Sequence, residues 1–178
     1  MTDGGLVIDI NLSGIEETVA NLKVFPVDLE IGLTLAMNKS LPLVEGEVVK
    51  RTPKNLGELQ GGINHQIITP FPNLVGSVGS PTPYAIVIEK GRKPNSRMPP
   101  IAAIAFWLYR KGIVTDRDEI RSVAYAVAKS IAKHGFSPKG NVGPTGARMF
   151  EEGFTAAEPH VVRLFNDAVV KATAQAND

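Results

Sequence analysis

The fold class follows from residues 63–79, which read INHQIITPFPNLVGSVG. Two short runs with β-branched residues, 63–69 and 74–79, are separated by a segment that contains Pro70 and Pro72. Short runs of this kind, divided by proline and glycine, are typical of neighbouring antiparallel strands. The sequence therefore predicts that at least two strands of a small sheet lie in this region.

Two further segments outside this region are compatible with strands. Residues 6–12 alternate in polarity at their end and suit a short strand, followed by a predicted helix over residues 13–22. Residues 84–89 form a third apolar run, and their pattern leaves a strand and a helix open.

Helical periodicity surrounds the predicted sheet. Residues 28–50 carry apolar side chains on one face after a capping Asp28, and Pro42 is expected to end or kink this helix. Residues 51–62 are expected to form a loop. Residues 100–111 and 116–134 each show a helical stripe that ends at a glycine. A last helical stretch runs from 149 to 172, with a kink or a break expected at Pro159.

These elements predict an α+β fold: a small antiparallel β-sheet packed against several α-helices, with a long basic loop and a C-terminal helix. We expect a single domain over residues 1–178, with an N-terminal strand and helix extension at 1–25 and a core at 28–178. The predicted core comprises Leu33, Val87, Ile104, Trp107, Leu108, Val123, Val127, Ile131, Phe150, Phe154, Leu164 and Phe165.

The composition excludes several classes of protein. Hydrophobic residues make up 43% and charged residues 21% of the 178 residues, which is close to the globular average and unlike a disordered chain. The longest apolar runs are too short to span a bilayer, and residues 1–5 lack the pattern of a signal peptide. The absence of cysteine excludes disulfides and thiolate metal sites, and it is compatible with a reducing compartment.

The net charge of +1 conceals a segregation of charge along the chain. Residues 1–50 carry a net charge of −5, residues 51–140 carry +8, and residues 141–178 carry −2. Opposite charges on different parts of one chain favour head-to-tail association between copies. A chance variation among solvated surfaces is the alternative interpretation.

No motif of catalysis or cofactor binding appears. The three histidines, His65, His134 and His160, lie far apart and lack the spacing of metal ligands. Ser77 lacks the glycine spacing of a nucleophile elbow, and the glycine-rich residues 140–146 lack the spacing of a phosphate-binding loop. We therefore expect no enzyme activity, no cofactor and no bound metal.

The basic loop over residues 91–100 is the candidate interface. It carries Arg92, Lys93 and Arg97, followed by Met98, Pro99 and Pro100. Three cations are enough for about three phosphate contacts, so a small nucleic-acid-binding module is one hypothesis. No aromatic residue is interleaved to stack on bases, and a solvated loop is the simpler alternative.

Four short motifs follow one another along the chain. They are Thr52–Leu59 (TPKNLGEL), Tyr84–Gly91 (YAIVIEKG), Met98-Pro99-Pro100 with Trp107 and Lys111-Gly112, and Ile131–Phe136 (IAKHGF) followed by Met149-Phe150. In this order they resemble the tail-completion (head–tail joining, minor tail protein Z-like) family of long-tailed bacteriophages and prophages, and the resemblance spans roughly residues 29–172. Leu56 stands where a threonine is common in that family, and the first fifty residues are longer than usual.

The resemblance implies a structural virion protein. Such proteins form a ring, often of six copies, in the neck between the capsid connector and the tail tube, and genomic DNA passes through the ring. It implies self-association and contacts with neighbouring connector or head-completion proteins and with tail-terminator or tail-tube proteins, without catalysis and without a membrane. On this hypothesis the loop of Arg92, Lys93 and Arg97 contacts an acidic surface on a neighbour. A tail-terminator or head-closure ring protein is the alternative within the same class.

Overall fold

The computed structural model describes residues 6–11, 27–54, 57–138 and 145–175. The chain divides into two compact units. The sheet unit comprises Met1–Ala85 and Arg148–Asp178, and the hairpin unit comprises Ile86–Ala147. The hairpin unit is thus an insertion in the chain of the sheet unit. The single-domain interpretation of the sequence stays a prediction. The helix expected over residues 13–22 lies outside the described residues.

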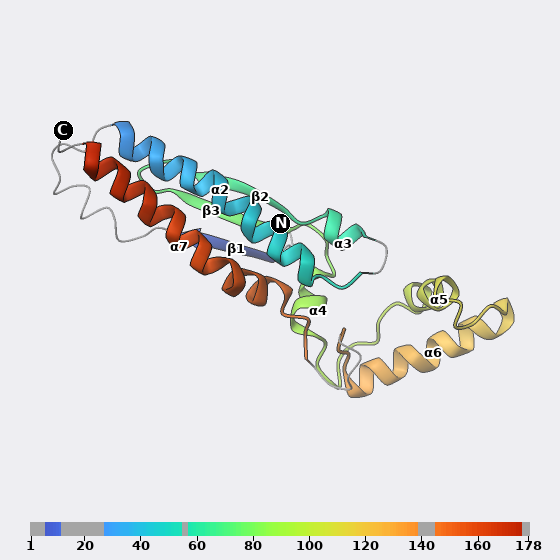
Figure 1. The fold of residues 1–178 in the computed structure, drawn as a ribbon. Coiled ribbons are helices and arrows are strands. Elements are labelled where there is room, and N and C mark those ends of the chain that lie inside the picture. Colours follow the sequence, from blue (N-terminus) through green and yellow to red (C-terminus); the bar gives the residue numbers. More distant parts are fainter. Residues whose placement is uncertain (1–5, 12–26, 55–56, 139–144, 176–178) are drawn as a thin grey trace. The chain divides into compact units, whose positions relative to one another are not determined.

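The sheet unit contains a three-stranded antiparallel sheet (Figure 1). Its strands are β1 (Leu6–Asn11), β2 (Asn64–Thr69) and β3 (Val75–Ser80), in the order β1-β3-β2. Val78 in the central strand pairs with Ile8 on one side and His65 on the other. The α+β class and the strands predicted around residues 63–79 are confirmed.

Two long antiparallel helices, α2 (Val27–Arg51) and α7 (Met149–Gln175), pack side by side in the sheet unit (Figure 1). Helix α2 also packs against β2 and β3. A Cβ on Gly76 of β3 would lie 2.6 Å from Met37 Sδ and 2.7 Å from Leu41 Cδ2, so this glycine leaves the space that the side chains of α2 occupy. The core of the unit therefore lies between α2 and the sheet and along the α2–α7 contact.

Each long helix continues through an internal proline, Pro42 in α2 and Pro159 in α7. The break that the sequence left open at Pro159 does not occur. A proline removes the hydrogen bond to the carbonyl four residues earlier, which belongs to Asn38 in α2 and to Thr155 in α7. Both prolines and both of these residues are exposed, so water can hydrogen-bond to the carbonyl groups that lose their helical partner.

Glycine allows α2 and α7 to approach closely at one end of their contact. A Cβ on Gly153 of α7 would lie 2.7 Å from Val48 Cγ2 and 2.9 Å from the Cα and N atoms of Val48. Near the other end, a Cβ on Gly32 would lie 3.6 Å from Ala168 Cβ, an ordinary contact. The tightest constraint of the helix pair is therefore the absence of a side chain at Gly153.

Two short helices lie in segments for which the sequence did not clearly predict a helix. Helix α3 (Glu58–Gly61) lies within the segment expected to be a loop, and it begins after Gly57, whose φ is 81°. Residues 84–89 gave an open choice between strand and helix, and the structure has helix α4 (Ala85–Lys90) there.

The hairpin unit is built on helices α5 (Ile101–Arg110) and α6 (Arg117–His134), which pack against each other. The side chain of Asp116 caps α6 by accepting a hydrogen bond of 2.9 Å from the amide of Asp118. Gly112 (φ 65°) follows α5 and Gly135 (φ 82°) ends α6. Both helices therefore lie where the sequence pattern predicts them, with the predicted glycines after their ends.

Close contacts join the two ends of the hairpin unit to each other. The Ala147 amide donates a 2.7 Å hydrogen bond to the Ile88 carbonyl, and a Cβ on Gly146 would overlap the backbone of Glu89 and Lys90. The outgoing and returning segments thus lie in direct contact within this unit.

The predicted core is confirmed in part. Leu33, Leu108, Phe150 and Phe165 are buried. Trp107 is 39% exposed, so its prediction as a core residue is wrong. Leu108 is the buried residue of α5, and the neighbouring Trp107 points to a different side of the helix. The remaining predicted residues are half-buried: Val87, Ile104, Val123, Val127, Ile131, Phe154 and Leu164.

The α2–α7 contact gives a first prediction. Gly153→Ala places a methyl group against the backbone of Val48, and we expect the free energy of unfolding to fall by about 1–3 kcal/mol because the helices must separate. Gly46→Ala is the matched control, since a Cβ there meets nothing within 4 Å and alanine favours the helix. Urea unfolding followed by circular dichroism measures both. Equal stability of the two variants contradicts the close approach.

Candidate interaction surface

The six loop residues predicted as an interface lie together in the hairpin unit, between α4 and α5. The loop is held against the end of α6 by backbone hydrogen bonds. Arg92 exchanges two with Phe136, of 2.9 and 3.0 Å, and the Ser96 amide donates one of 3.1 Å to the Ala132 carbonyl. A Cβ on Gly135 would collide with the Arg92 carbonyl oxygen, so the glycine that ends α6 also admits the loop.

Arg92 has a structural role within the loop. Its Nε donates a 3.0 Å hydrogen bond to Ser96 Oγ, and its Nη2 donates to the Arg97 carbonyl. These bonds close the loop around Asn95, whose positive φ of 56° turns the chain. The Arg92 guanidinium is therefore engaged inside the loop rather than presented to a partner.

The rest of the loop is presented to solvent. Lys93, Arg97, Met98 and Pro100 are exposed, and Pro99 is half-buried. Within the described part of the chain, neither Lys93 nor Arg97 forms an ion pair. Their charges are thus available to an external anion or acidic surface.

Next to this loop in sequence, α5 exposes large apolar side chains that the sequence analysis did not single out as a surface. Phe106 is 56% exposed, Tyr109 55% and, just after the helix, Ile113 57%. The Arg110 guanidinium lies 5.7 Å from the centroid of the Phe106 ring. The available signal was the composition of α5, IAAIAFWLYR, which is apolar on every side. One flanking helix cannot cover all sides of such a helix.

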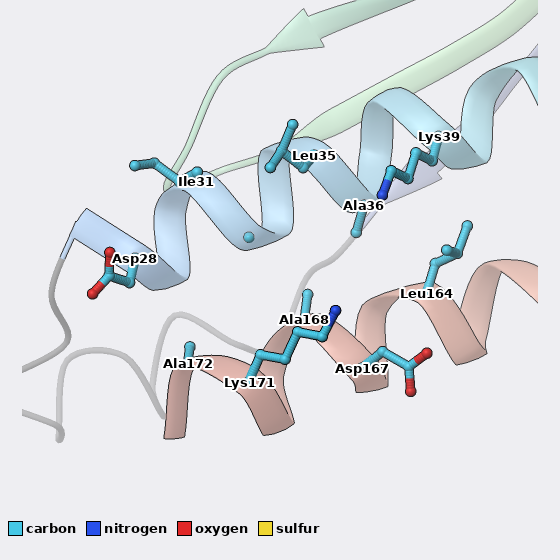
Figure 2. A pocket seen from close by; sticks show the side chains of 11 residues that line it. Asp28, Ile31, Leu35, Ala36, Lys39, Leu164, Asp167, Ala168, Lys171 and Ala172 are labelled. Atoms are coloured by element: carbon cyan, nitrogen blue, oxygen red, sulfur yellow. The ribbon is translucent and has the colours of Figure 1, made fainter. Parts of the chain in front are cut away.

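A groove lies between α2 and α7 in the sheet unit, with a volume of about 500 Å³ (Figure 2). Ile31 and Leu35 of α2 line it and are 49% and 52% exposed, and Leu164 of α7 also lines it. The small residues Gly32, Ala36, Ala168 and Ala172 complete its apolar lining, and Asp28, Lys39, Asp167 and Lys171 contribute two negative and two positive charges.

A second concavity, near the end of α2 and the start of α7, is lined by Arg51, Arg148, Glu151, Glu152, Thr155 and Ala156, and the lining residue Arg51 pairs with Glu47. Glu47 accepts hydrogen bonds from Lys50 and Arg51, which lower the pKa of its carboxyl to about 2. Arg148 pairs with Glu151 through both nitrogens of its fork, with one bond of 2.7 Å, and lowers the pKa of that carboxyl. Both carboxylates therefore stay ionised at neutral pH and have cationic partners, which does not suit a general acid or base.

The charge segregation follows the division of the chain into two units. The hairpin unit contains 11 basic and 4 acidic residues, a net charge of +7, and the sheet unit contains 8 basic and 14 acidic residues, a net charge of −6. The boundaries of the compact units thus preserve the charge separation seen along the sequence, where residues 51–140 carry +8 and the two flanking segments together carry −7. The exposed apolar surface on α5 therefore lies in the positively charged unit, and the groove lies in the negatively charged unit.

Comparison of the chain with known protein families, curated proteins and solved structures found no match. The resemblance to tail-completion proteins therefore remains a prediction from the motifs. Among the described residues, no group of three or more histidine, aspartate or glutamate side chains is placed to hold a metal ion. Over the same residues, the structure contains no helix with the length and apolar character needed to cross a bilayer.

The contact of the loop with α6 gives a second prediction. Gly135→Ala adds a methyl group against the Arg92 carbonyl at a backbone conformation that favours glycine. We expect the free energy of the folded state to rise by about 1–3 kcal/mol. We expect faster hydrogen exchange at the amides of Arg92, Ser96 and Phe136. Gly112→Ala is the control, because it has a similar positive φ but no atom within 4 Å of the added Cβ. The same protection of those amides in both variants contradicts the assignment.

Proposed function

We propose that this protein is a structural component of a tailed-bacteriophage virion, which forms a ring at the head–tail interface, completes the tail and joins it to the DNA-filled capsid. The order of the four sequence motifs motivates this proposal. The observation that carries it is the opposite charge of the two compact units, −6 and +7, on one chain. A ring requires that one surface of a subunit meets a different surface of the next, and opposite charges orient such an encounter.

The proposed partners follow from this function. The protein associates with itself, often as six copies in the family it resembles, and contacts connector and tail-tube proteins above and below. Genomic DNA passes through the lumen without sequence-specific binding. The proposal includes assembly in the bacterial cytoplasm and residence in the virion neck, and it involves no catalytic site and no cofactor.

Within this function, Lys93 and Arg97 are the loop residues that meet an acidic neighbour, since Arg92 is engaged within the loop. This narrows the candidate interface from the three cations of the sequence analysis to two. Met98 is 37% exposed and adds apolar contact beside them.

A tail-terminator or head-closure ring protein is the alternative role, and the phenotype of particles that lack the protein separates the roles. Filled heads and finished tails that remain unjoined indicate tail completion, whereas tails of abnormal length indicate a terminator. A nucleic-acid-binding module is favoured instead if submicromolar protein retards DNA in a gel and salt abolishes the shift.

The loop gives a third prediction. Lys93→Glu/Arg97→Glu reverses two exposed charges, and we expect electron micrographs of complemented phage lysates to show separate filled heads and tails, with a loss of infectious particles. Arg117→Glu/Lys129→Glu is the matched control, because it changes the charge of the hairpin unit by the same amount on α6 instead of the loop. Normal joining in the loop variant overturns the role of the loop.

A further inference from the structure

The hairpin unit leaves much of its apolar surface without a partner in its own chain. In the described part of this unit, the buried hydrophobic residues are few and mostly small: Leu108, Val114, Ala124, Ala128 and Ala147. A unit of this size buries a small fraction of its surface and gains stability from association. The exposed Phe106, Tyr109 and Ile113 form an aromatic surface at α5 that such association would cover.

The α2–α7 groove in the sheet unit has the complementary character. It is concave and apolar at Ile31, Leu35 and Leu164, whereas the α5 surface presents projecting aromatic side chains. Aromatic side chains that enter an apolar depression are the usual anchors of protein interfaces.

Charge favours this pairing chiefly through the two units as wholes. Exposed Arg110 and Lys111 follow the aromatic residues of α5. They can pair with Asp28 and Asp167 of the groove, which Lys39 and Lys171 also line. The net charges of the two units, +7 and −6, extend this complementarity beyond the contact residues. An apolar centre with a charged rim is the general anatomy of a specific interface.

We propose that the aromatic surface of α5 in one copy docks into the α2–α7 groove of a second copy of this chain. The contact is heterologous, so a pair of subunits still has one free groove and one free α5, and association continues until a ring closes. This interface adds a site of self-association to the proposed function. Only the closure of a ring in a virion rests on the proposed function, whereas the docking of two copies does not.

The test uses two variants of the full chain. Phe106→Glu/Tyr109→Glu removes the aromatic surface, and Ile31→Glu/Leu35→Glu removes the groove. We expect the unmodified protein to form oligomers larger than a dimer, with weaker association at high salt, when its mass is measured by light scattering. Each variant should be monomeric, with association at least about 30-fold weaker, as expected for the loss of one interface hot spot.

Mixing the two variants distinguishes docking from misfolding. The groove variant retains an intact α5 and the α5 variant retains an intact groove, so an equimolar mixture should form a heterodimer and no larger species. Circular dichroism checks that each variant is folded. Ile68→Glu/Val162→Glu and Ala126→Glu/Ser130→Glu are the controls, since they add the same charge at other exposed positions of the two units and should assemble normally.

Three outcomes overturn the inference. They are an unmodified protein that stays monomeric at every concentration and salt, folded variants that assemble as it does, and a mixture that yields no heterodimer. A monomer in which α5 covers its own groove falls under the first outcome. Because these measurements use purified protein, they stand apart from the phage phenotype. Normal head–tail joining without the protein refutes the proposed virion role but leaves the heterologous interface unaffected.

Discussion

The sheet unit depends on the close approach of α2 and α7 at Gly153. Val48 contacts the backbone of α7 there, with no space for a Cβ on the glycine. These helices come from opposite ends of the chain, and the whole hairpin unit is inserted between them. Their contact therefore joins the two parts of the chain that make up the sheet unit, one ending at Ala85 and the other beginning at Arg148, in one core.

The insertion has a similar constraint at its own base. Gly146 lies against the backbone of Glu89, and the Ala147 amide binds the Ile88 carbonyl. Arg92 and Phe136 then form a two-bond bridge one step farther along the unit. These contacts hold the two ends of the insertion together within the hairpin unit. The same bridge between Arg92 and Phe136 also fixes the position of the basic loop.

The sequence was most informative where local physics decides the structure. Glycine and proline delimited the strands around residues 63–79, and the Asp116 cap and Gly135 marked both ends of α6. It was less informative where tertiary context decides. Pro159 does not divide α7, because its exposed position lets water replace the lost hydrogen-bond partner. Trp107 was predicted to be buried because apolar periodicity identifies a helix but does not say how many neighbours cover it. The groove between α2 and α7 joins residues more than one hundred positions apart, and no local pattern encodes such a pairing.

The relation between charge and compactness explains why the candidate surface was only partly predictable. The net charges of sequence segments indicated a basic middle region, within which the loop over residues 91–100 was the candidate interface. The structure shows instead that the basic residues share one compact unit with an exposed aromatic helix, while Arg92 serves the loop itself. Electrostatic attraction between units of opposite net charge brings two copies together without fixing how their surfaces align. Shape and apolar contact fix that alignment at short range. A chain that carries both kinds of surface, on units of opposite charge, has the physical requirements for directional self-association, and the loop cations then remain available for a different neighbour.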